Sequence, residues 1–201
     1  NTWQKKTPMQ TPRCAAGTAV TPDGKVYVLG GWSLLQQKYL DVVERYDPLT
    51  DTWQTRAPLP TQRGSLGAAA DNQGKVYAIG GFNEKGQTLA IVEQYDPLTD
   101  TWKTCAPMSL SRFELSAVRA SNNRIYALGG INSCAGLTTV EEYDPQQDKW
   151  SATDPMPAAR WAMGVCATDS GKIYAIGGLS KANGNFSVLN TNEEATLQAV
   201  F

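Results

Sequence analysis

The chain has 201 residues, of which 41% are hydrophobic and 18% are charged. This composition is typical of a folded globular protein and excludes extensive disorder. The net charge of -1 at pH 7 excludes strong bulk attraction to nucleic acid or to anionic lipid. No apolar run approaches the roughly 20 residues that a transmembrane helix needs. We therefore expect neither a nucleic-acid partner nor a membrane partner.

The chain contains no histidine. It therefore lacks the commonest metal ligand and general base, which excludes Ser-His-Asp and Cys-His catalysis within the chain. We accordingly expect no cofactor and no bound metal.

Four cysteines occupy non-equivalent places and form no CxxC pair: Cys14, Cys105, Cys134 and Cys166. Free thiols in a reducing compartment are the favoured interpretation, and a disulfide is the alternative, because spacing does not fix connectivity. The N-terminal stretch NTWQKKTPMQ has no apolar segment of signal-peptide type. We expect a cytoplasmic location, although a signal that had been removed would leave no trace.

Three sequence markers recur in phase along the chain. Tryptophan occurs at Trp3, Trp53, Trp102 and Trp150, arginine at Arg13, Arg63, Arg112 and Arg160, and a glycine pair begins at Gly30, Gly80, Gly129 and Gly177. Each series advances by 50, 49 and 48 residues, as in the steps from 3 to 53, 102 and 150. A shared period of this length indicates a repeat protein.

Within the first repeat, the local signals are nearly all β. A strand is expected after the arginine, and the turn PDGK at 22–25 leads to a second strand in KVYVLGG at 25–31. The third strand is VERYD at 43–47, and the turn DPLTD at 47–51 precedes a fourth strand that carries Trp53. We call these strands a, b, c and d. No segment has a convincing helical period.

A four-stranded antiparallel unit of about 50 residues cannot bury both of its faces alone, but sheets stacked radially cover one another. The sequence therefore predicts an all-β fold, a β-propeller in a single domain. Its repeats span approximately 4–53, 54–102, 103–150 and 151–201, and the last is degenerate. Glycine pairs suit close approach of a neighbouring sheet or a positive φ.

The combination PMQTPR…VYVLGG…VERYDP…W resembles the kelch repeat, and its markers recur in order four times between Trp3 and Gly178. The resemblance implies propeller blades of four strands. It also implies a protein-interaction module or scaffold, as in the kelch halves of BTB-kelch ubiquitin-ligase adaptors. The expected partner is a protein or a peptide.

The fourth repeat loses its markers in SVLNTNEEATLQAVF, at 187–201, where Val188 is the expected position of strand c. Two closures compete. The N-terminal strand at Trp3 could complete the fourth blade and close a four-bladed ring, which predicts a monomer. Alternatively, ATLQAVF at 195–201 is the fourth d strand and the chain is part of a larger propeller, which predicts self-association or additional blades.

The repeated arginines are the first candidate site. Arg13, Arg63, Arg112 and Arg160 each begin an innermost strand, so their guanidinium groups are expected around one mouth of the central channel. In kelch adaptors that resemble this chain, arginines at this position help to bind acidic segments, which suits a planar group that can hold a carboxylate with two hydrogen bonds. The alternative is structural, because Glu44, Glu93 and Glu141 also recur and Leu189 falls at the fourth position.

The loops between strands b and c are the second candidate surface, because they differ in length and chemistry while the strands stay constant. Trp32 and Phe82 follow glycine pairs and could present aromatic contact area, with packing between blades as the alternative. We do not expect an enzyme. The alternative is a kelch-type sugar enzyme such as a sialic-acid mutarotase, for which Glu114 is the carboxylate that breaks the repeat.

Overall fold

The computed structural model describes residues 1–133, 135–182 and 185–197. The described part of the chain contains β-strands and no helix, as the repeat predicted. None of these residues belongs to a helix that is long and apolar enough to span a bilayer.

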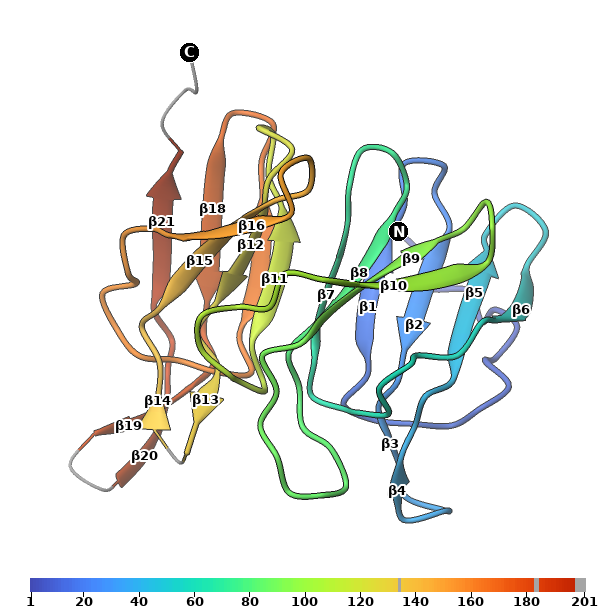
Figure 1. Cartoon of the computed structure of the whole chain (residues 1–201), viewed down its shortest axis with the longest axis horizontal. Helices are drawn as coiled ribbons and strands as arrows, with labels where there is room; N and C mark the ends of the chain where they lie inside the picture. Colours follow the sequence, from blue (N-terminus) through green and yellow to red (C-terminus); the bar gives the residue numbers. More distant parts are fainter. Residues whose placement is uncertain (134, 183–184, 198–201) are drawn as a thin grey trace.

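The strands form the four antiparallel blades of a β-propeller, arranged in a ring around a common axis (Figure 1). Blade 1 contains β1 (Gly17–Val20), β2 (Val26–Leu29), β5 (Val43–Asp47) and β6 (Thr52–Arg56). Blade 2 contains β7 (Gly67–Ala70), β8 (Val76–Ile79), β9 (Val92–Asp96) and β10 (Thr101–Cys105). Blade 3 contains β11 (Ser116–Arg119), β12 (Ile125–Leu128), β15 (Val140–Asp144) and β16 (Lys149–Ala152). Blade 4 contains β17 (Gly164–Ala167), β18 (Lys172–Ile176) and β21 (Asn192–Thr196).

Three of the loops between strands b and c fold into small hairpins. These are formed by β3 (Trp32–Ser33) with β4 (Lys38–Tyr39), by β13 (Ile131–Asn132) with β14 (Ala135–Gly136), and by β19 (Leu179–Ala182) with β20 (Asn185–Val188). All the b–c loops project from the lower edge of Figure 1, whereas the a–b turns lie at its upper edge.

The turn between strands c and d follows the predicted chemistry. In blade 1, the Asp47 carboxylate accepts a hydrogen bond from the backbone N–H of Leu49 at 3.0 Å. The Tyr46 hydroxyl donates to Asp51 at 2.6 Å, and Tyr46 pairs across the strands with Trp53. These local bonds fix the turn and hold the two aromatic rings together, with centroids 5.0 Å apart.

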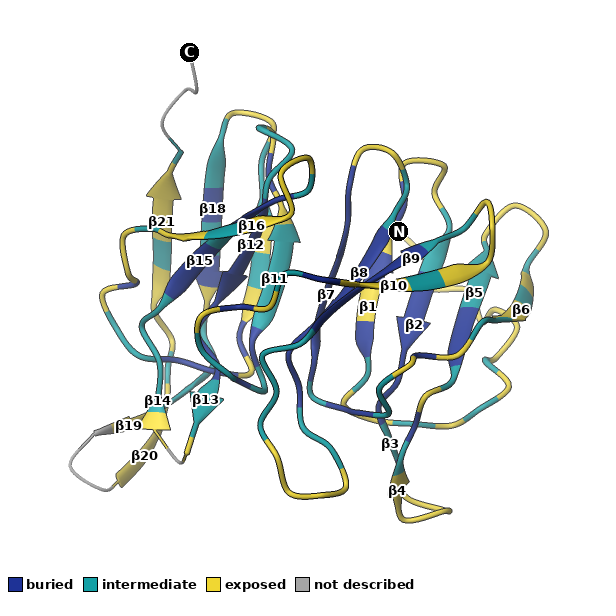
Figure 2. Cartoon of the chain, viewed as in Figure 1, coloured by how far each residue is buried: buried dark blue, intermediate teal, exposed yellow. Residues whose placement is uncertain are grey.

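The core lies between consecutive blades, where three hydrophobic clusters fill the spaces between facing sheets. Tyr27 meets Tyr95 in the first cluster, and Tyr77 meets Tyr143 in the second, with ring centroids 5.8 and 5.6 Å apart. Each fully buried large apolar side chain stabilises the fold by about 1.5–3 kcal/mol. Figure 2 shows that burial is concentrated in the strands between neighbouring blades, such as β2, β8 and β12, whereas β16 and β21 are largely exposed.

The glycine pairs serve both of the purposes that their position suggested. Gly30 and Gly31 have φ values of 57° and 106°, which other residues adopt with strain. A Cβ on Gly30 would lie 2.3 Å from the carbonyl oxygen of Arg63 in the next blade. The backbones of adjacent blades therefore meet at the glycine pair, where Gly31 N–H donates to that same carbonyl at 3.0 Å.

The fourth blade corrects the expected position of strand c. Val188 lies in β20, which pairs with β19 in the b–c hairpin. Strand c is β21, which begins four residues later and pairs with β18. In the described residues this sheet has three strands. The possible d strand at 195–201 falls partly on β21 and partly on 198–201, which lie outside the described residues.

The N-terminal segment does not form the strand that was expected to close the ring at the fourth blade. Residues 1–8 form no strand, and Trp3 is fully exposed. The segment instead follows blade 1, where Thr7 N–H donates to Asp51 at 3.0 Å and the Trp53 indole donates to the Thr7 carbonyl at 2.8 Å. Trp3 therefore does not complete the fourth blade.

Blades 1 and 4 are the two ends of the series, and we call the region between them the seam. Consecutive inner strands pack side by side, β1 with β7, β7 with β11 and β11 with β17. At the seam, Ile176 of β18 is 49% exposed and Val20 of β1 is 62% exposed. The equivalents of Ile176 in the other blades are at most 3% exposed: Leu29, Ile79 and Leu128. The seam faces are therefore less covered than the faces between blades.

Candidate functional site

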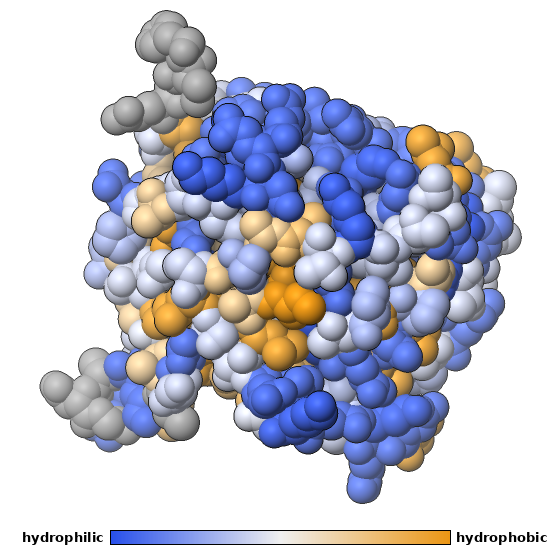
Figure 3. Space-filling model, viewed as in Figure 1, coloured by the Kyte–Doolittle hydropathy of each residue, from blue (hydrophilic) through white to orange (hydrophobic). Residues whose placement is uncertain are grey.

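The surface formed by the b–c loops differs most between repeats. We call this surface the loop face (Figure 1). It comprises the described residues of the four b–c loops, 32–41, 82–90, 131–138 and 179–190. It also includes the pairs of residues that follow the arginines, 14–15, 64–65, 113–114 and 161–162. Leu34 and Leu35 of the first loop are 74% and 85% exposed, and Phe186 of the fourth is 72% exposed. Figure 3 shows one side of the molecule, on which small hydrophobic patches are separated by hydrophilic residues.

A row of half-buried aromatic side chains crosses the loop face. Trp32 and Tyr39 come from the hairpin of blade 1, and their ring centroids are 4.7 Å apart. Tyr39 lies 6.0 Å from Phe82 of blade 2, which lies 5.2 Å from Phe113 at the start of blade 3. Trp32 and Phe82, which the sequence indicated, therefore belong to one row, and both remain partly exposed. Phe82 packs against rings of the two neighbouring blades, whereas Trp32 packs against Tyr39 of its own hairpin. Tyr39 was not singled out from the sequence, although its loop was.

The inner end of the loop face is built by one residue from each repeat. Ala15, Ser65, Glu114 and Ala162 follow the arginines by two positions, and all have φ between 50° and 53°. Backbone N–H groups connect them in order, from Ser65 to the carbonyl of Ala15 at 2.7 Å, from Glu114 to that of Ser65 at 2.8 Å, and from Ala162 to that of Glu114 at 3.0 Å. We call these four residues the mouth. In the described part of the chain, no such bond joins Ala15 to Ala162.

Glu114 is the one ionisable residue of the mouth, because its equivalents are two alanines and a serine. Burial raises the pKa of its carboxyl above the usual value. Among the described residues, the Glu114 carboxylate has no hydrogen bond and no ion pair within 4.0 Å. The residue that breaks the repeat is thus also a half-buried, unpaired carboxylate.

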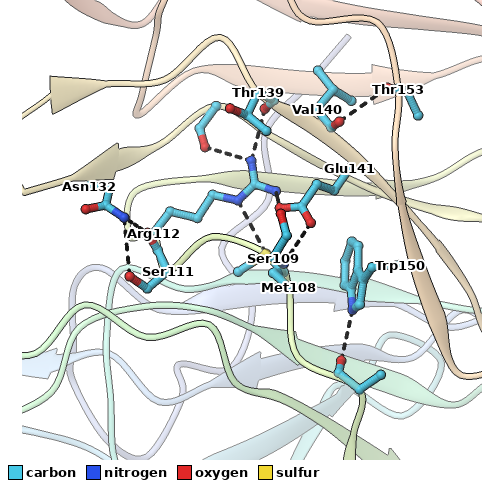
Figure 4. A network of polar contacts seen from close by, with 12 residues as sticks. Met108, Ser109, Ser111, Arg112, Asn132, Thr139, Val140, Glu141, Trp150 and Thr153 are labelled. Carbon is cyan, nitrogen blue, oxygen red and sulfur yellow. Dashed lines mark hydrogen bonds and ion pairs between the residues drawn. The ribbon is translucent and has the colours of Figure 1, made fainter.

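The four repeated arginines are paired inside the blades. Arg112 donates to Glu141 at 2.6 Å and to the carbonyls of Thr139 and Gly129 at 3.0 and 3.3 Å (Figure 4). Arg63 donates to Glu93 at 2.5 Å, and Arg13 pairs with Glu44. All four arginine side chains are 0% exposed. Burial lowers the pKa of the Arg112 guanidinium, and the charge of Glu141 opposes this effect.

The fourth arginine corrects a sequence-based expectation. Arg160 was expected to lack a glutamate, because Leu189 falls at the repeat position. In the structure, Glu193 of β21 forms the ion pair with Arg160, and the Thr191 hydroxyl accepts a hydrogen bond from the same guanidinium at 2.9 Å. The Arg–Glu pair is therefore present in all four blades, and the longer b–c loop of blade 4 has displaced its acidic partner along the sequence.

This recurring set of arginine, glycine pair and glutamate agrees with the family comparison, in which the kelch motif matches residues 13–60, 67–109 and 114–157. The chain belongs to the kelch-repeat family. Kelch propellers are typically protein-interaction modules. A comparison with curated proteins found no match.

In this kelch propeller, the arginines do not present free guanidinium groups at the mouth. Each is neutralised by a glutamate of its own blade and also bonds backbone carbonyls, so the arrangement favours the structural alternative over a ligand-binding ring. Their role is to tie strand c and the b–c connection to the segment that enters strand a, as Arg112 does with Glu141 and Thr139.

The upper edge of the kelch propeller has a polar hollow of about 620 Å³ between blades 2 and 3. Its buried groups are bonded to one another. The Tyr77 hydroxyl donates to Asp71 at 3.0 Å and accepts from the Gln94 amide, while Lys75 pairs with Asp96. The hollow therefore offers no unpaired charge from these groups, in contrast to the mouth.

The described cysteines are free thiols, with Cys14 and Cys166 exposed and Cys105 buried. Cys134 lies outside the described residues. Within the described ranges, no group of three or more Asp, Glu or Cys residues is placed to hold a metal ion.

Proposed function

We propose that this kelch propeller binds a protein or peptide partner through its loop face. The observation that carries the proposal is the aromatic row from Trp32 to Phe113, together with the exposed Leu34 and Leu35, which lie between β3 and β4. Large aromatic and aliphatic side chains on varied loops are the usual anchors of protein interfaces. The paired blades beneath hold these loops in place, as a rigid scaffold does in other binding proteins.

The proposal does not include an acidic ligand. That expectation depended on free guanidinium groups, and the four arginines are buried and paired with glutamates. The charge at the mouth is instead the carboxylate of Glu114.

We propose no catalytic activity. Acid–base chemistry on a sugar needs at least two positioned groups. Among the described residues, Glu114 has no hydrogen-bonded acid or base beside it, so this carboxylate alone does not support the mutarotase alternative.

Selection of binders from a displayed random-peptide library tests the proposal. The selected peptides are then titrated against Leu34→Ser/Leu35→Ser and Phe82→Ala. The matched control is Leu49→Ser/Leu98→Ser, because these leucines are 89% and 92% exposed but lie in the c–d turns, away from the loop face. We expect the loop-face changes to weaken binding about tenfold or more and the control to have no effect. Peptides that bind all three variants as tightly as the parent would contradict the proposal.

A further inference from the structure

The mouth contains one charged residue, Glu114, at a position where the other three repeats have an uncharged residue. Three of the four equivalent residues are Ala15, Ser65 and Ala162, and the fourth is Glu114. The backbone around Glu114 is fixed on both sides, because its N–H donates to Ser65 and its carbonyl accepts from Ala162. The side chain therefore projects from a rigid position that the fold does not require to be acidic.

Two glutamates in the blade interiors, Glu93 and Glu141, have polar partners that Glu114 lacks. Glu93 and Glu141 each pair with an arginine and accept a further hydrogen bond, from the Thr61 hydroxyl at 2.7 Å and from Ser109 N–H at 2.9 Å. In the described part of the chain, the carboxylate of Glu114 has neither. A carboxylate that is partly removed from water gains most from a cationic partner.

Aromatic side chains of the loop face lie next to residues of the mouth. The Tyr39 ring covers Gly64, where an added Cβ would lie 3.0 Å from a ring carbon, and Gly64 directly precedes the mouth residue Ser65. Burial raises the pKa of the Tyr39 phenol, and the negative charge of Glu114 adds to this effect. Ser65, which follows Gly64, accepts the backbone hydrogen bond of Glu114 at 2.8 Å, so Tyr39 and Glu114 flank the same part of the mouth. Phe113 precedes Glu114 in the chain and packs against Phe82.

We propose that Glu114, Tyr39, Phe82 and Phe113 form a seat for an arginine side chain of the protein partner. A guanidinium group can hydrogen-bond a carboxylate through two N–H groups and stack on an aromatic face at the same time. The exposed lysines of the loop face do not occupy this role, since Lys38, Lys85 and Lys181 form no ion pair with Glu114 in the described structure. This inference rests on the proposed function, because it specifies the chemistry of the partner at the same surface.

The test uses two small probes and needs no identified partner. N-acetyl-arginine methylamide is titrated into the isotope-labelled protein, and amide shifts are followed by NMR. N-acetyl-citrulline methylamide is the matched neutral probe. The variants are Glu114→Gln and, as a control on the same face, Glu84→Gln. A third variant, Ser65→Glu in the Glu114→Ser background, moves the carboxylate to the neighbouring position of the mouth.

We expect the arginine probe to shift the amides of residues 113–115 and of Tyr39, and the citrulline probe to bind about tenfold more weakly. Glu114→Gln should weaken the arginine probe about tenfold, Glu84→Gln should not, and the relocated carboxylate should restore part of the affinity. Equal binding of the two probes, or shifts that persist in Glu114→Gln with its spectrum otherwise unchanged, would overturn the inference. Selected peptides that bind the loop face but are insensitive to Glu114→Gln would overturn this seat while leaving the proposed function intact.

Discussion

Arg63 and Glu93 form a buried ion pair in blade 2, in which Nη1 lies 2.5 Å from Oε2 and neither side chain is more than 1% exposed. The arginine enters the pair from the segment before strand a, and the glutamate comes from strand c. The guanidinium also donates to the carbonyls of Thr61 and Ala78 at 2.8 and 3.1 Å. The pair therefore holds three segments of the chain together.

Removing one member of this pair should be costly. Arg63→Met leaves the Glu93 carboxylate buried without its charge partner, and we expect the free energy of unfolding to fall by about 3–5 kcal/mol. The double variant Arg63→Met/Glu93→Leu should lose less than the single variant, because it removes the uncompensated charge. Urea denaturation of both proteins measures the difference. A double variant as unstable as the sum of the two single changes would contradict this account.

The same change at the end of the series should have a smaller effect. The side chain of Glu193, the partner of Arg160, is 16% exposed, against 1% for Glu93, so it is less completely removed from water, although its Oε2 is buried without a hydrogen bond. We expect Arg160→Met to reduce the free energy of unfolding less than Arg63→Met does, in the same urea titration. Equal losses of unfolding free energy in the two variants would show that the burial of the acidic partner does not determine the size of the destabilisation.

The fold was largely predictable from the sequence, because the repeated residues are ones whose backbone conformation and packing are specific to a propeller blade. Gly30 recurs in all four repeats and Tyr46 in the first three, in steps of 48 to 50 residues, and their conformational and packing requirements are those of a blade. The position of strand c in blade 4 was not predictable, since the longer b–c hairpin moved Glu193 out of phase with Glu44. The burial of the arginines was foreseen only as an alternative. Ion pairing depends on the distance between the charged groups in the folded chain, and the sequence alone does not give the distance between an arginine and a glutamate about 30 residues apart.

Gly30 provides a test of the contact between adjacent blades. Gly30→Ala would place a Cβ 2.3 Å from the carbonyl oxygen of Arg63 and also force φ of +57° on alanine. Overpacking and backbone strain together should cost about 2–5 kcal/mol. Gly24→Ala is the matched control, because Gly24 has φ of +78° with no atom within 4 Å of an added Cβ, and it should cost about 1–2 kcal/mol. Thermal denaturation of the two variants compares overpacking plus backbone strain in Gly30→Ala with backbone strain alone in Gly24→Ala. Equal losses of stability would argue against a steric clash between the added Cβ and the Arg63 carbonyl.

The seam gives a prediction about unequal burial of equivalent residues. Ile79 and Ile176 occupy the same position of strand b, but their side chains are 0% and 49% exposed. Ile79→Ala should reduce the free energy of unfolding by about 2–5 kcal/mol, and Ile176→Ala by less than about 1 kcal/mol. Chemical denaturation at low protein concentration compares them. A large loss for Ile176→Ala would mean that another surface covers the seam in solution.

The c–d turn of blade 2 predicts a dependence of stability on pH. Asp100 accepts hydrogen bonds from Ala57 N–H at 3.0 Å and from the Tyr95 hydroxyl at 2.5 Å, and these bonds hold the pKa of its carboxyl below the usual value of 3.8. A lowered pKa in the folded state stabilises the protein at a pH above 3.8, and this contribution is lost as the pH falls through the folded-state value. The urea midpoint should therefore fall with pH below about 4. Asp100→Asn should make this fall less steep, whereas Glu84→Gln, at an exposed loop carboxylate, should leave it as in the parent. An unchanged slope in Asp100→Asn would show that the turn carboxylate does not contribute to acid sensitivity.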